Sequence, residues 1–164
     1  MFEDYRIGSG FDVHAYAENR AMVLCNMTIP SSIGLQGHSD ADAPLHALCD
    51  ALLGATGLGD IGMHFPDNDM TYKNIDSAVL LSRVMDLIQQ GGFVIQNVDL
   101  TIMAQIPKIA PYRESMRCRL AGLLSIDLDR VNIKATTTEG LGFIGRKEGL
   151  AAHAVVLLKK ESTI

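Results

Sequence analysis

Apolar residues recur along the chain at helical spacing in three segments. The first stripe has the spacing i, i+3, i+4, i+7 and i+8 of a single helix face and consists of Leu45, Leu48, Cys49, Leu52 and Leu53. A second stripe runs from Leu80 to Ile88, where Asp76 can cap the start and Gly91 can end the helix. Pro111 suits the first turn of a third helix. The pattern therefore predicts three helices.

Other segments alternate between apolar and polar residues with the period of two that is typical of strands. In residues 94–105, Val98, Leu100 and Ile102 would face one way and the intervening polar residues the other. The remaining predicted strands are residues 5–14, 21–25, 131–136 and 150–159, and the predicted loops are residues 54–74 and 137–149. Because strands and helices interleave, we predict an α/β (α+β) fold. We expect a single domain over residues 1–164, with one mixed sheet and about three helices packed on one face.

Composition narrows the class of protein further. The chain has 164 residues, of which 48% are hydrophobic, 20% charged and only 5% aromatic, with a net charge of −5. Such a chain can bury a core without disulfides, and its three cysteines with no CxxC pattern favour a reducing compartment. Few aromatic residues and no basic run argue against nucleic acid and anionic membranes as partners. Without a signal-like or membrane-spanning apolar run, a cytoplasmic location is expected.

The first candidate site is the Asp12-Val13-His14 segment. In a strand, residues i and i+2 point to the same face, so Asp12 and His14 would project together. A carboxylate and an imidazole are both good zinc ligands. A polar strand end is the alternative interpretation, because the Asp-x-His pattern is common.

His46 is the third candidate ligand, at the margin of the apolar stripe of its helix. Asp42 and Asp50 lie four residues either side of it, so either could accept the hydrogen of the ring nitrogen that faces away from a metal. Three protein ligands and an open position are typical of a catalytic zinc. The alternative is a boundary histidine paired with a carboxylate. Of the other histidines, we expect His153 within a strand and His64 exposed in a loop.

Residues at and after the end of the predicted strand 131–136 could bind phosphate. Three hydroxyls, Thr136, Thr137 and Thr138, are followed by Glu139 and Gly140. Hydroxyls and free backbone N–H groups suit phosphate oxygens, and a carboxylate suits Mg²⁺. The segments 59–62 and 65–67 could present backbone and carboxylates to a ligand, although turn chemistry alone also explains their composition.

Taken together, these segments resemble the 2-C-methyl-D-erythritol 2,4-cyclodiphosphate synthase family of the non-mevalonate isoprenoid pathway. The segments that carry the resemblance are residues 8–14, 37–46, 58–62, 65–67, 97–99, 104–108, 132–139, 142–143 and 145–146, in order over nearly the whole chain. Small departures are Tyr16 for a frequent Phe, and Cys25 and Asn26 within a segment where the family usually has two glycines.

The resemblance implies an activity and an assembly. The family is a phosphorus-oxygen lyase that cyclises 4-diphosphocytidyl-2-C-methyl-D-erythritol 2-phosphate to 2-C-methyl-D-erythritol 2,4-cyclodiphosphate and releases CMP. It implies a homotrimer with active sites between subunits, and a channel on the trimer axis that can hold an isoprenyl diphosphate. The location implied is the bacterial cytoplasm, or the plastid stroma if a transit peptide was removed.

The resemblance also implies roles for individual residues. Zinc would be held by Asp12, His14 and His46, and a magnesium or manganese ion by Glu139. The implied catalytic residues are His38, Thr137 and Glu139. The implied substrate-binding residues are Asp12, His14, His38, Ser39, Asp60, Ile61, Gly62, Phe65, Pro66, Asp67, Asn68, Asp69, Ala104, Pro107, Lys108, Ile109, Ala110, Thr136, Thr137, Thr138, Glu139, Phe143 and Arg146.

Two other functions stay open at this point. One is a zinc-dependent phosphoester hydrolase with Asp60 or Asp67 as its base. The other is a non-catalytic trimeric ligand-binding protein. A cyclase needs no activated serine or cysteine, because its nucleophile belongs to the substrate and the protein mainly positions groups and neutralises charge. The absence of a nucleophile motif and the acidity of the chain both fit that chemistry, since metals would supply the positive charge.

Overall fold

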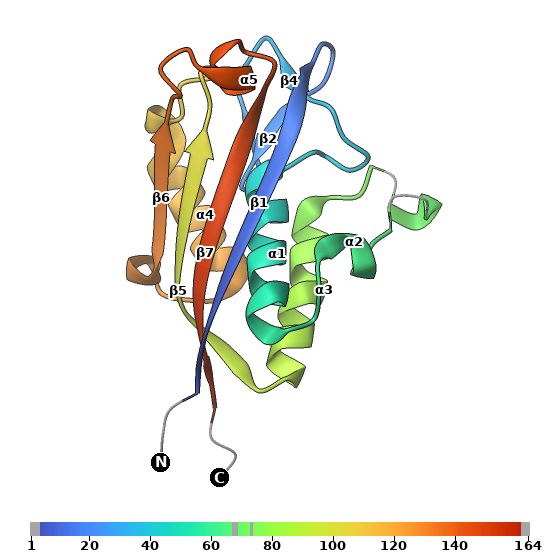
Figure 1. Cartoon of the computed structure of the whole chain (residues 1–164), viewed down its shortest axis with the longest axis vertical. Helices are drawn as coiled ribbons and strands as arrows, with labels where there is room; N and C mark the ends of the chain where they lie inside the picture. The colour runs from blue at the N-terminus through green and yellow to red at the C-terminus, as the bar shows by residue number, and fades with distance from the viewer. Residues whose placement is uncertain (1–3, 67–68, 73, 162–164) are drawn as a thin grey trace.

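A five-stranded mixed sheet forms the centre of the molecule (Figure 1). The computed structural model describes residues 4–66, 69–72 and 74–161. The strands of the sheet are β1 (Tyr5–Ala17), β4 (Gly34–Leu35), β5 (Phe93–Met103), β6 (Val131–Thr136) and β7 (Gly149–Lys160). Their order is β4-β1-β7-β5-β6; β5 and β6 run parallel, and the other neighbours are antiparallel. The predicted fold class is confirmed.

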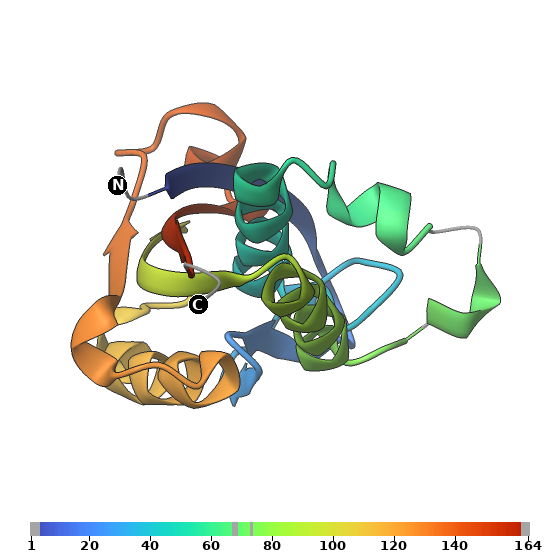
Figure 2. The ribbon, with the colours of Figure 1, turned by 90° about the horizontal axis from the view of Figure 1, so that it is seen from below.

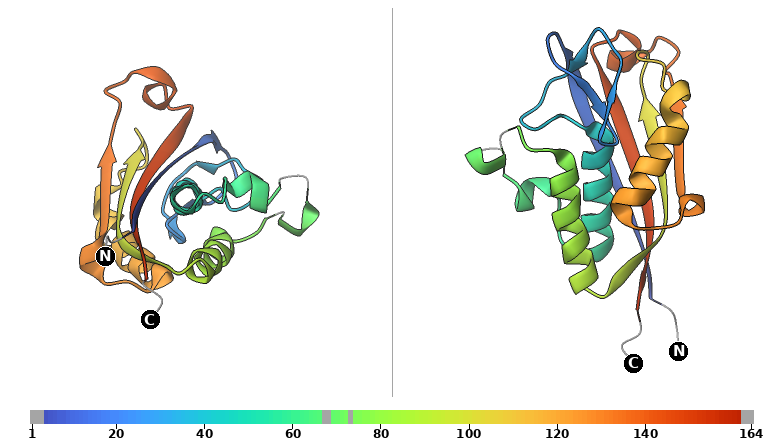
Figure 3. Two further views of the ribbon diagram at one scale, coloured as in Figure 1. Left: turned by 60° about the horizontal axis from the view of Figure 1, so that its bottom comes forward. Right: turned by 180° about the vertical axis from the view of Figure 1, so that it is seen from behind.

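Three long helices cover one face of this sheet. They are α1 (Ala43–Thr56), α3 (Ser77–Gln90) and α4 (Arg113–Leu124), and they lie in front of the strands when the molecule is seen from behind (right view of Figure 3). Their apolar stripes pack into one core with the inward residues of β5 and β7. Among the described residues, no helix has the length and apolar character that crossing a bilayer requires.

Several boundaries differ from the predictions. The predicted loop 54–74 contains the short helix α2 (Ile61–His64) and the 3₁₀ turn η1 (Met70–Tyr72), which project from the body of the molecule (Figure 2). Asp60 caps the start of α2, and its carboxylate accepts the Met63 N–H at 2.9 Å. The second predicted loop contains α5 (Gly142–Gly145). Such one-turn helices carry too few residues for a periodic signal.

The predicted strand 21–25 and the predicted start of the third helix also differ from the structure. The predicted strand 21–25 is shorter, β2 (Met22–Leu24), and it pairs with β3 (Met27–Ile29) in a separate hairpin. Pro111 lies in the 3₁₀ turn η2 (Ala110–Tyr112), and α4 begins only at Arg113. The remaining 3₁₀ turn, η3 (Leu128–Arg130), leads directly into β6.

Glycines on β1 allow α1 to lie directly against the strand, and β1 curves around that helix (left view of Figure 3). A Cβ atom on Gly8 would lie 1.8 Å from the Ala51 carbonyl oxygen, and one on Gly10 would lie 1.9 Å from the Ala47 oxygen. No side chain fits at either position, so the two backbones approach closely. This approach brings the start of α1 next to the end of β1 that carries Asp12 and His14.

The other face of β1 is open and largely apolar. Tyr5, Ile7, Phe11 and Val13 alternate with the inward glycines, and Ile7 is 73% exposed and Phe11 56%. We call this the outer face of β1. Contiguous exposed apolar residues are uncommon on a monomer and are typical of an interaction surface.

Candidate metal centre

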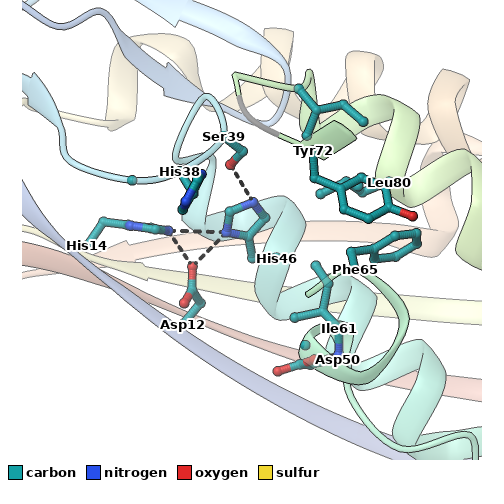
Figure 4. A pocket seen from close by; sticks show the side chains of 13 residues that line it. Asp12, His14, His38, Ser39, His46, Asp50, Ile61, Phe65, Tyr72 and Leu80 are labelled. Atoms are coloured by element: carbon teal, nitrogen blue, oxygen red, sulfur yellow. Dashed lines mark hydrogen bonds and ion pairs between the residues drawn. The ribbon is translucent and has the colours of Figure 1, made fainter. Parts of the chain in front are cut away.

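Three potential metal ligands meet where β1 and α1 touch. Asp12 and His14 come from β1 and His46 from α1, and Figure 4 shows their side chains pointing toward one another. The Asp12 Oδ2 atom lies 2.9 Å from His14 Nε2 and 3.1 Å from His46 Nδ1, and the two nitrogens are 3.1 Å apart. One ligand atom from each residue lies within 4.8 Å of the others. The structure thus brings together the three ligands that the sequence predicts.

The donor set itself fits a cation. The other nitrogen of His14, Nδ1, lies 2.7 Å from the Gln36 carbonyl oxygen, which can only accept, so Nδ1 carries a hydrogen. The lone pair on Nε2 is then directed at the Asp12 carboxylate and the facing nitrogen of His46. Three electron-rich atoms at this separation repel one another unless a proton or a metal ion lies between them. Two imidazoles and one carboxylate with space beside them suit zinc.

Neither of the predicted carboxylates accepts from His46. The His46 Nε2 atom lies instead 2.9 Å from Ser77 Oγ and 3.2 Å from Ser39 Oγ. Asp42 caps α1 by accepting the Leu45 N–H at 3.2 Å, and Asp50 is engaged elsewhere. The expectation for Asp42 and Asp50 is therefore wrong, because both carboxylates are turned toward backbone N–H groups.

Those two carboxylates instead anchor the segments around the site. Asp42 also accepts the Cys25 and Asn26 N–H groups at 2.9 and 2.6 Å, which ties the β2–β3 turn to α1. Its complete burial raises its pKa to about 7. Asp50 accepts the Ile61 N–H at 2.7 Å and so holds the start of α2.

The charges in the centre are strongly coupled. Burial by itself would raise the pKa of Asp12, but the close approach of the His14 and His46 rings outweighs burial and holds that pKa well below its ordinary value. Burial by itself would lower the pKa of His14, but Asp12 and the Gln36 carbonyl outweigh it and raise that pKa. Asp12 is thus an anion at neutral pH, ready to pair with a cation.

A cavity of about 360 Å³ opens beside the three ligands. The predicted substrate-binding residues that line it are His38, Ser39, Ile61, Gly62 and Phe65, together with Asp12 and His14. It is also lined by Tyr72, Ile75 and Leu80, which were not among the predicted site residues. Figure 4 shows Tyr72 and Leu80 at this cavity. The Phe65 and Tyr72 rings pack edge to face with their centroids 5.5 Å apart. In the sequence, the segments 59–62 and 65–67 pointed to this region, but no signal pointed to Tyr72 or Ile75.

Other predicted residues of that loop lie outside the cavity lining. Asp60 caps α2, Pro66 is exposed, and Asp69 accepts the Thr71 N–H at 2.9 Å from an exposed position. Asp67 and Asn68 lie outside the described residues.

A second group of predicted residues gathers at the ends of the parallel strands β5 and β6. The Ala104 N–H donates to the Thr136 carbonyl at 3.0 Å and thereby joins the two strand ends. Beyond them, the Thr138 N–H donates to the Gln105 side chain at 3.1 Å. The Thr137 hydroxyl donates to Glu139 Oε1 at 3.0 Å, and Glu139 is exposed. Hydroxyls, backbone N–H groups and a carboxylate thus converge on one side of the sheet edge.

The remaining predicted residues surround this second group. Pro107 is partly buried and Ile109 buried, whereas Lys108 and Ala110 are exposed. Phe143 lies in α5 and is 38% exposed. Arg146 donates to Glu148 at 2.6 Å. None of these residues lines the cavity beside the candidate metal ligands.

Within one chain the two groups lie apart. β6 is one edge of the sheet, and β7 and β5 separate it from β1. At the usual strand spacing of about 4.8 Å, the three intervals from β1 to β6 span about 14 Å. A single chain therefore does not place Glu139 beside Asp12, His14 and His46.

The other two histidines have local partners. The His153 ring lies 2.8 Å from the Ser9 hydroxyl across the β1–β7 pair, as expected for a residue within a strand. His64 is partly buried in α2 with its Nε2 2.8 Å from the Leu58 carbonyl oxygen, so the expectation of an exposed loop residue is wrong. Of the cysteines, Cys25 and Cys49 are buried and Cys118 is exposed, and all three are free thiols.

A mixed sheet with helices on one face and an Asp-His-His cluster open to a cavity defines an α+β protein with a candidate metal centre. The YgbB family model matches residues 5–159, and the chain belongs to this family. It is 55% identical over 157 residues to the 2-C-methyl-D-erythritol 2,4-cyclodiphosphate synthases of Bacillus cytotoxicus and Bacillus mycoides, covering 96% of this chain and 99% of each relative. The resemblance seen in the sequence is confirmed.

Solved structures with the same fold support this family membership. The bifunctional IspDF from Campylobacter jejuni superposes with a TM-score of 0.94 at 46% identity, covering 98% of this chain and 44% of that one. IspF from Plasmodium falciparum, in a complex with CDP, superposes with a TM-score of 0.85 at 33% identity and covers 99% of this chain and 100% of that one.

Proposed function

We propose that the protein cyclises 4-diphosphocytidyl-2-C-methyl-D-erythritol 2-phosphate to 2-C-methyl-D-erythritol 2,4-cyclodiphosphate and releases CMP. The observation that carries the proposal is the Asp12, His14 and His46 cluster in the wall of a cavity of about 360 Å³. It is supported by relatives of that name at 55% identity and by the CDP complex of a similar structure. We propose the cytoplasm as its location, since the two Bacillus relatives are bacterial and three free thiols suit a reducing compartment.

The reaction requires no covalent bond between the protein and the substrate. An oxygen of the substrate's 2-phosphate attacks the β-phosphorus, and the bond from that phosphorus to the oxygen of the CMP phosphate breaks. The nucleophile is already an anion, so no residue has to remove a proton from it. When bound, zinc at Asp12, His14 and His46 and a magnesium or manganese ion at Glu139 supply positive charge to the phosphate oxygens.

The chain's own residues position the reacting groups. His38 projects into the cavity beside the metal ligands, and Thr137 carries a hydroxyl next to Glu139. We assign both to stabilising the charge that develops on the transferred phosphoryl group, because oriented donors act strongly there. Excluding water behind Phe65 and Tyr72 would favour attack by the 2-phosphate over hydrolysis.

Substrate contacts divide between the two groups of residues. We assign the methylerythritol phosphate to the cavity, with Ser39 and residues 65–69, and the ribose to Asp60, Ile61 and Gly62. The residues assigned to the cytosine base are Ala104, Pro107, Lys108, Ile109 and Ala110. The residues assigned to the diphosphate are Thr136, Thr138 and Arg146.

We further propose a homotrimer in which each active site is shared between subunits. The separation of about 14 Å between β1 and β6 supports this, because one chain alone cannot bring Glu139 to the metal ligands. The apolar outer face of β1, with Ile7 and Phe11 exposed, supports it too. Phe143 and Arg146 would line an axial channel able to take an isoprenyl diphosphate. Sedimentation equilibrium should give three times the monomer mass, and an active monomer at micromolar concentration would contradict the shared site.

Incubation with the proposed substrate in ¹⁸O-labelled water, followed by ³¹P NMR and mass spectrometry, tests the reaction. We expect equal amounts of CMP and a cyclic diphosphate without the label. A zinc hydrolase would instead incorporate ¹⁸O, and a non-catalytic binding protein would leave the substrate intact. In parallel, His46→Ala should lose zinc, whereas His153→Ala, which removes a histidine on β7, should keep it.

A further inference from the structure

A chain of hydrogen bonds reaches the rear of the His46 ring from α3. The His46 Nε2 atom lies 2.9 Å from the hydroxyl oxygen of Ser77, the first residue of α3. The Ser77 hydroxyl donates to Asp40 Oδ1, and the Ser77 backbone N–H donates to Asp40 Oδ2 at 3.0 Å. Ser77 is completely buried. We propose that Ser77 and Asp40 are positioning residues that fix the tautomer of His46, so that the lone pair of Nδ1 faces the metal.

The hydrogens available at Ser77 and Asp40 decide which nitrogen of His46 is protonated. An ionised carboxylate only accepts, and a serine hydroxyl has a single hydrogen. Because Ser77 gives that hydrogen to Asp40, its oxygen can only accept from His46. Nε2 must then carry the hydrogen of the neutral ring, which leaves Nδ1 free to bind a metal. The same logic already applies to His14, whose Nδ1 faces a carbonyl oxygen.

Ser39 cannot make this selection alone. Its hydroxyl oxygen also faces His46 Nε2, but at the longer distance of 3.2 Å. It accepts the Ala41 N–H at 3.2 Å, and no carboxylate is seen to receive its own hydrogen in the described part of the chain. A hydroxyl that can rotate either donates to the ring or accepts from it, so it is compatible with both tautomers. Ser77 differs because its hydroxyl hydrogen is donated to Asp40, so that only its oxygen is left to face His46.

Asp40 is itself held in place. Its backbone N–H donates to the Ile75 carbonyl at 3.2 Å, and the Asn74 N–H donates to the His38 carbonyl at 2.8 Å. These bonds join the segment before α1 to the segment before α3. The packing of the two helices therefore sets the position of the Ser77 hydroxyl relative to the His46 ring. Partners of this kind commonly affect metal affinity by about 10- to 100-fold.

Zinc affinity and the tautomer of His46 can be measured separately. Competition with a chromophoric chelator gives the affinity, and the ¹⁵N shifts of the two ring nitrogens in the zinc-free protein give the tautomer. We expect Ser77→Ala to weaken zinc binding by about 10- to 100-fold. Ser77→Thr keeps the hydroxyl and should recover most of that loss.

Asp40→Asn tests the direction of the hydrogen bonds. The amide can donate to Ser77 Oγ, which frees the serine hydrogen for His46 Nε2. We expect this variant to populate the Nδ1–H tautomer and to weaken zinc binding. Asp76→Ala is the matched control: it removes the carboxylate that accepts the Ala78 N–H at the same end of α3 but makes no contact with His46. It should lower stability while leaving zinc affinity and the ring shifts unchanged.

The positioning role of Ser77 and Asp40 rests on the proposed metal centre, but different measurements would contradict the two proposals. A wild-type protein that binds no zinc contradicts the metal centre, while the ¹⁵N measurement on the zinc-free protein still decides the tautomer. Wild-type ring shifts in Asp40→Asn, or wild-type zinc affinity in Ser77→Ala, would overturn the positioning role. An equal loss of zinc affinity in Asp76→Ala would overturn it too, because the effect would then be a general loosening of α3.

Discussion

Gly10 lies on β1 where the backbone of α1 approaches the strand too closely to admit a side chain. It precedes Asp12 by two residues and faces Ala47, the neighbour of His46. A Cβ at Gly10 would lie 1.9 Å from the Ala47 carbonyl oxygen, whereas ordinary contact begins at 3.4 Å. Gly10→Ala therefore requires the strand and the helix to separate by about 1.5 Å, the difference between these distances.

That displacement exceeds what either the core or a metal site tolerates. Overpacking a core costs about 1–3 kcal/mol and occasionally more, and here the obstructing atoms belong to the backbone, so we expect about 3 kcal/mol. Metal–ligand distances must hold to about 0.2 Å. Moving His46 relative to Asp12 should therefore weaken zinc binding at least about a hundredfold, beyond the range for losing an outer partner.

Urea unfolding with a chelator present measures the first effect, and zinc competition measures the second. Gly54→Ala is the matched control, because it adds the same methyl group to α1 at a position where the added Cβ points into open space. That control should gain about 0.5–1 kcal/mol from helix propensity and keep its zinc affinity. If Gly10→Ala bound zinc as tightly as the wild type, the close approach would not be what builds the metal centre.

Three further predictions address the site. Glu139→Gln should keep its zinc and its trimeric assembly but release CMP about a hundredfold more slowly, because this is the usual effect of losing one group that stabilises developing charge. Near-wild-type turnover across a Mg²⁺ titration would remove Glu139 from the mechanism. In the zinc-free protein, the ion pair of His14 with Asp12 contributes stability that is lost as pH rises through the raised pKa of His14. Zinc displaces that proton, so the Tm gained on adding zinc should grow from about pH 6 to about pH 8, and a constant gain would contradict this coupling. Tyr16→Phe removes the hydroxyl that donates to the Ile106 carbonyl at 2.5 Å, beside the residues assigned to the cytosine base. Losing this hydrogen bond costs about 1 kcal/mol, so CDP should bind about fivefold more weakly while zinc affinity stays unchanged. Equal CDP affinity in the variant would show that these residues need no such anchor.

Interactions between residues close together in the sequence determine the main helices and strands of this protein. The helical stripe of α1 and the cap at Asp76 depend on residues within a few positions of one another, so the sequence alone predicts them. The strand period likewise placed Asp12 and His14 on one face. The hydroxyl-rich end of β6 was also visible in the sequence, because it follows directly from where an apolar strand stops.

Only the tertiary structure decided what surrounds these residues. Helical spacing suggested that Asp42 or Asp50 would accept from His46, yet backbone N–H groups of Leu45 and Ile61 take those carboxylates. The actual partner, Ser77, is 31 residues away and arrives through the packing of α3 on α1. The separation of Glu139 from the metal ligands likewise depends on the order of strands in the sheet. Long-range partners of this kind leave no periodic signal, because they are set by how whole elements pack and not by spacing along the chain.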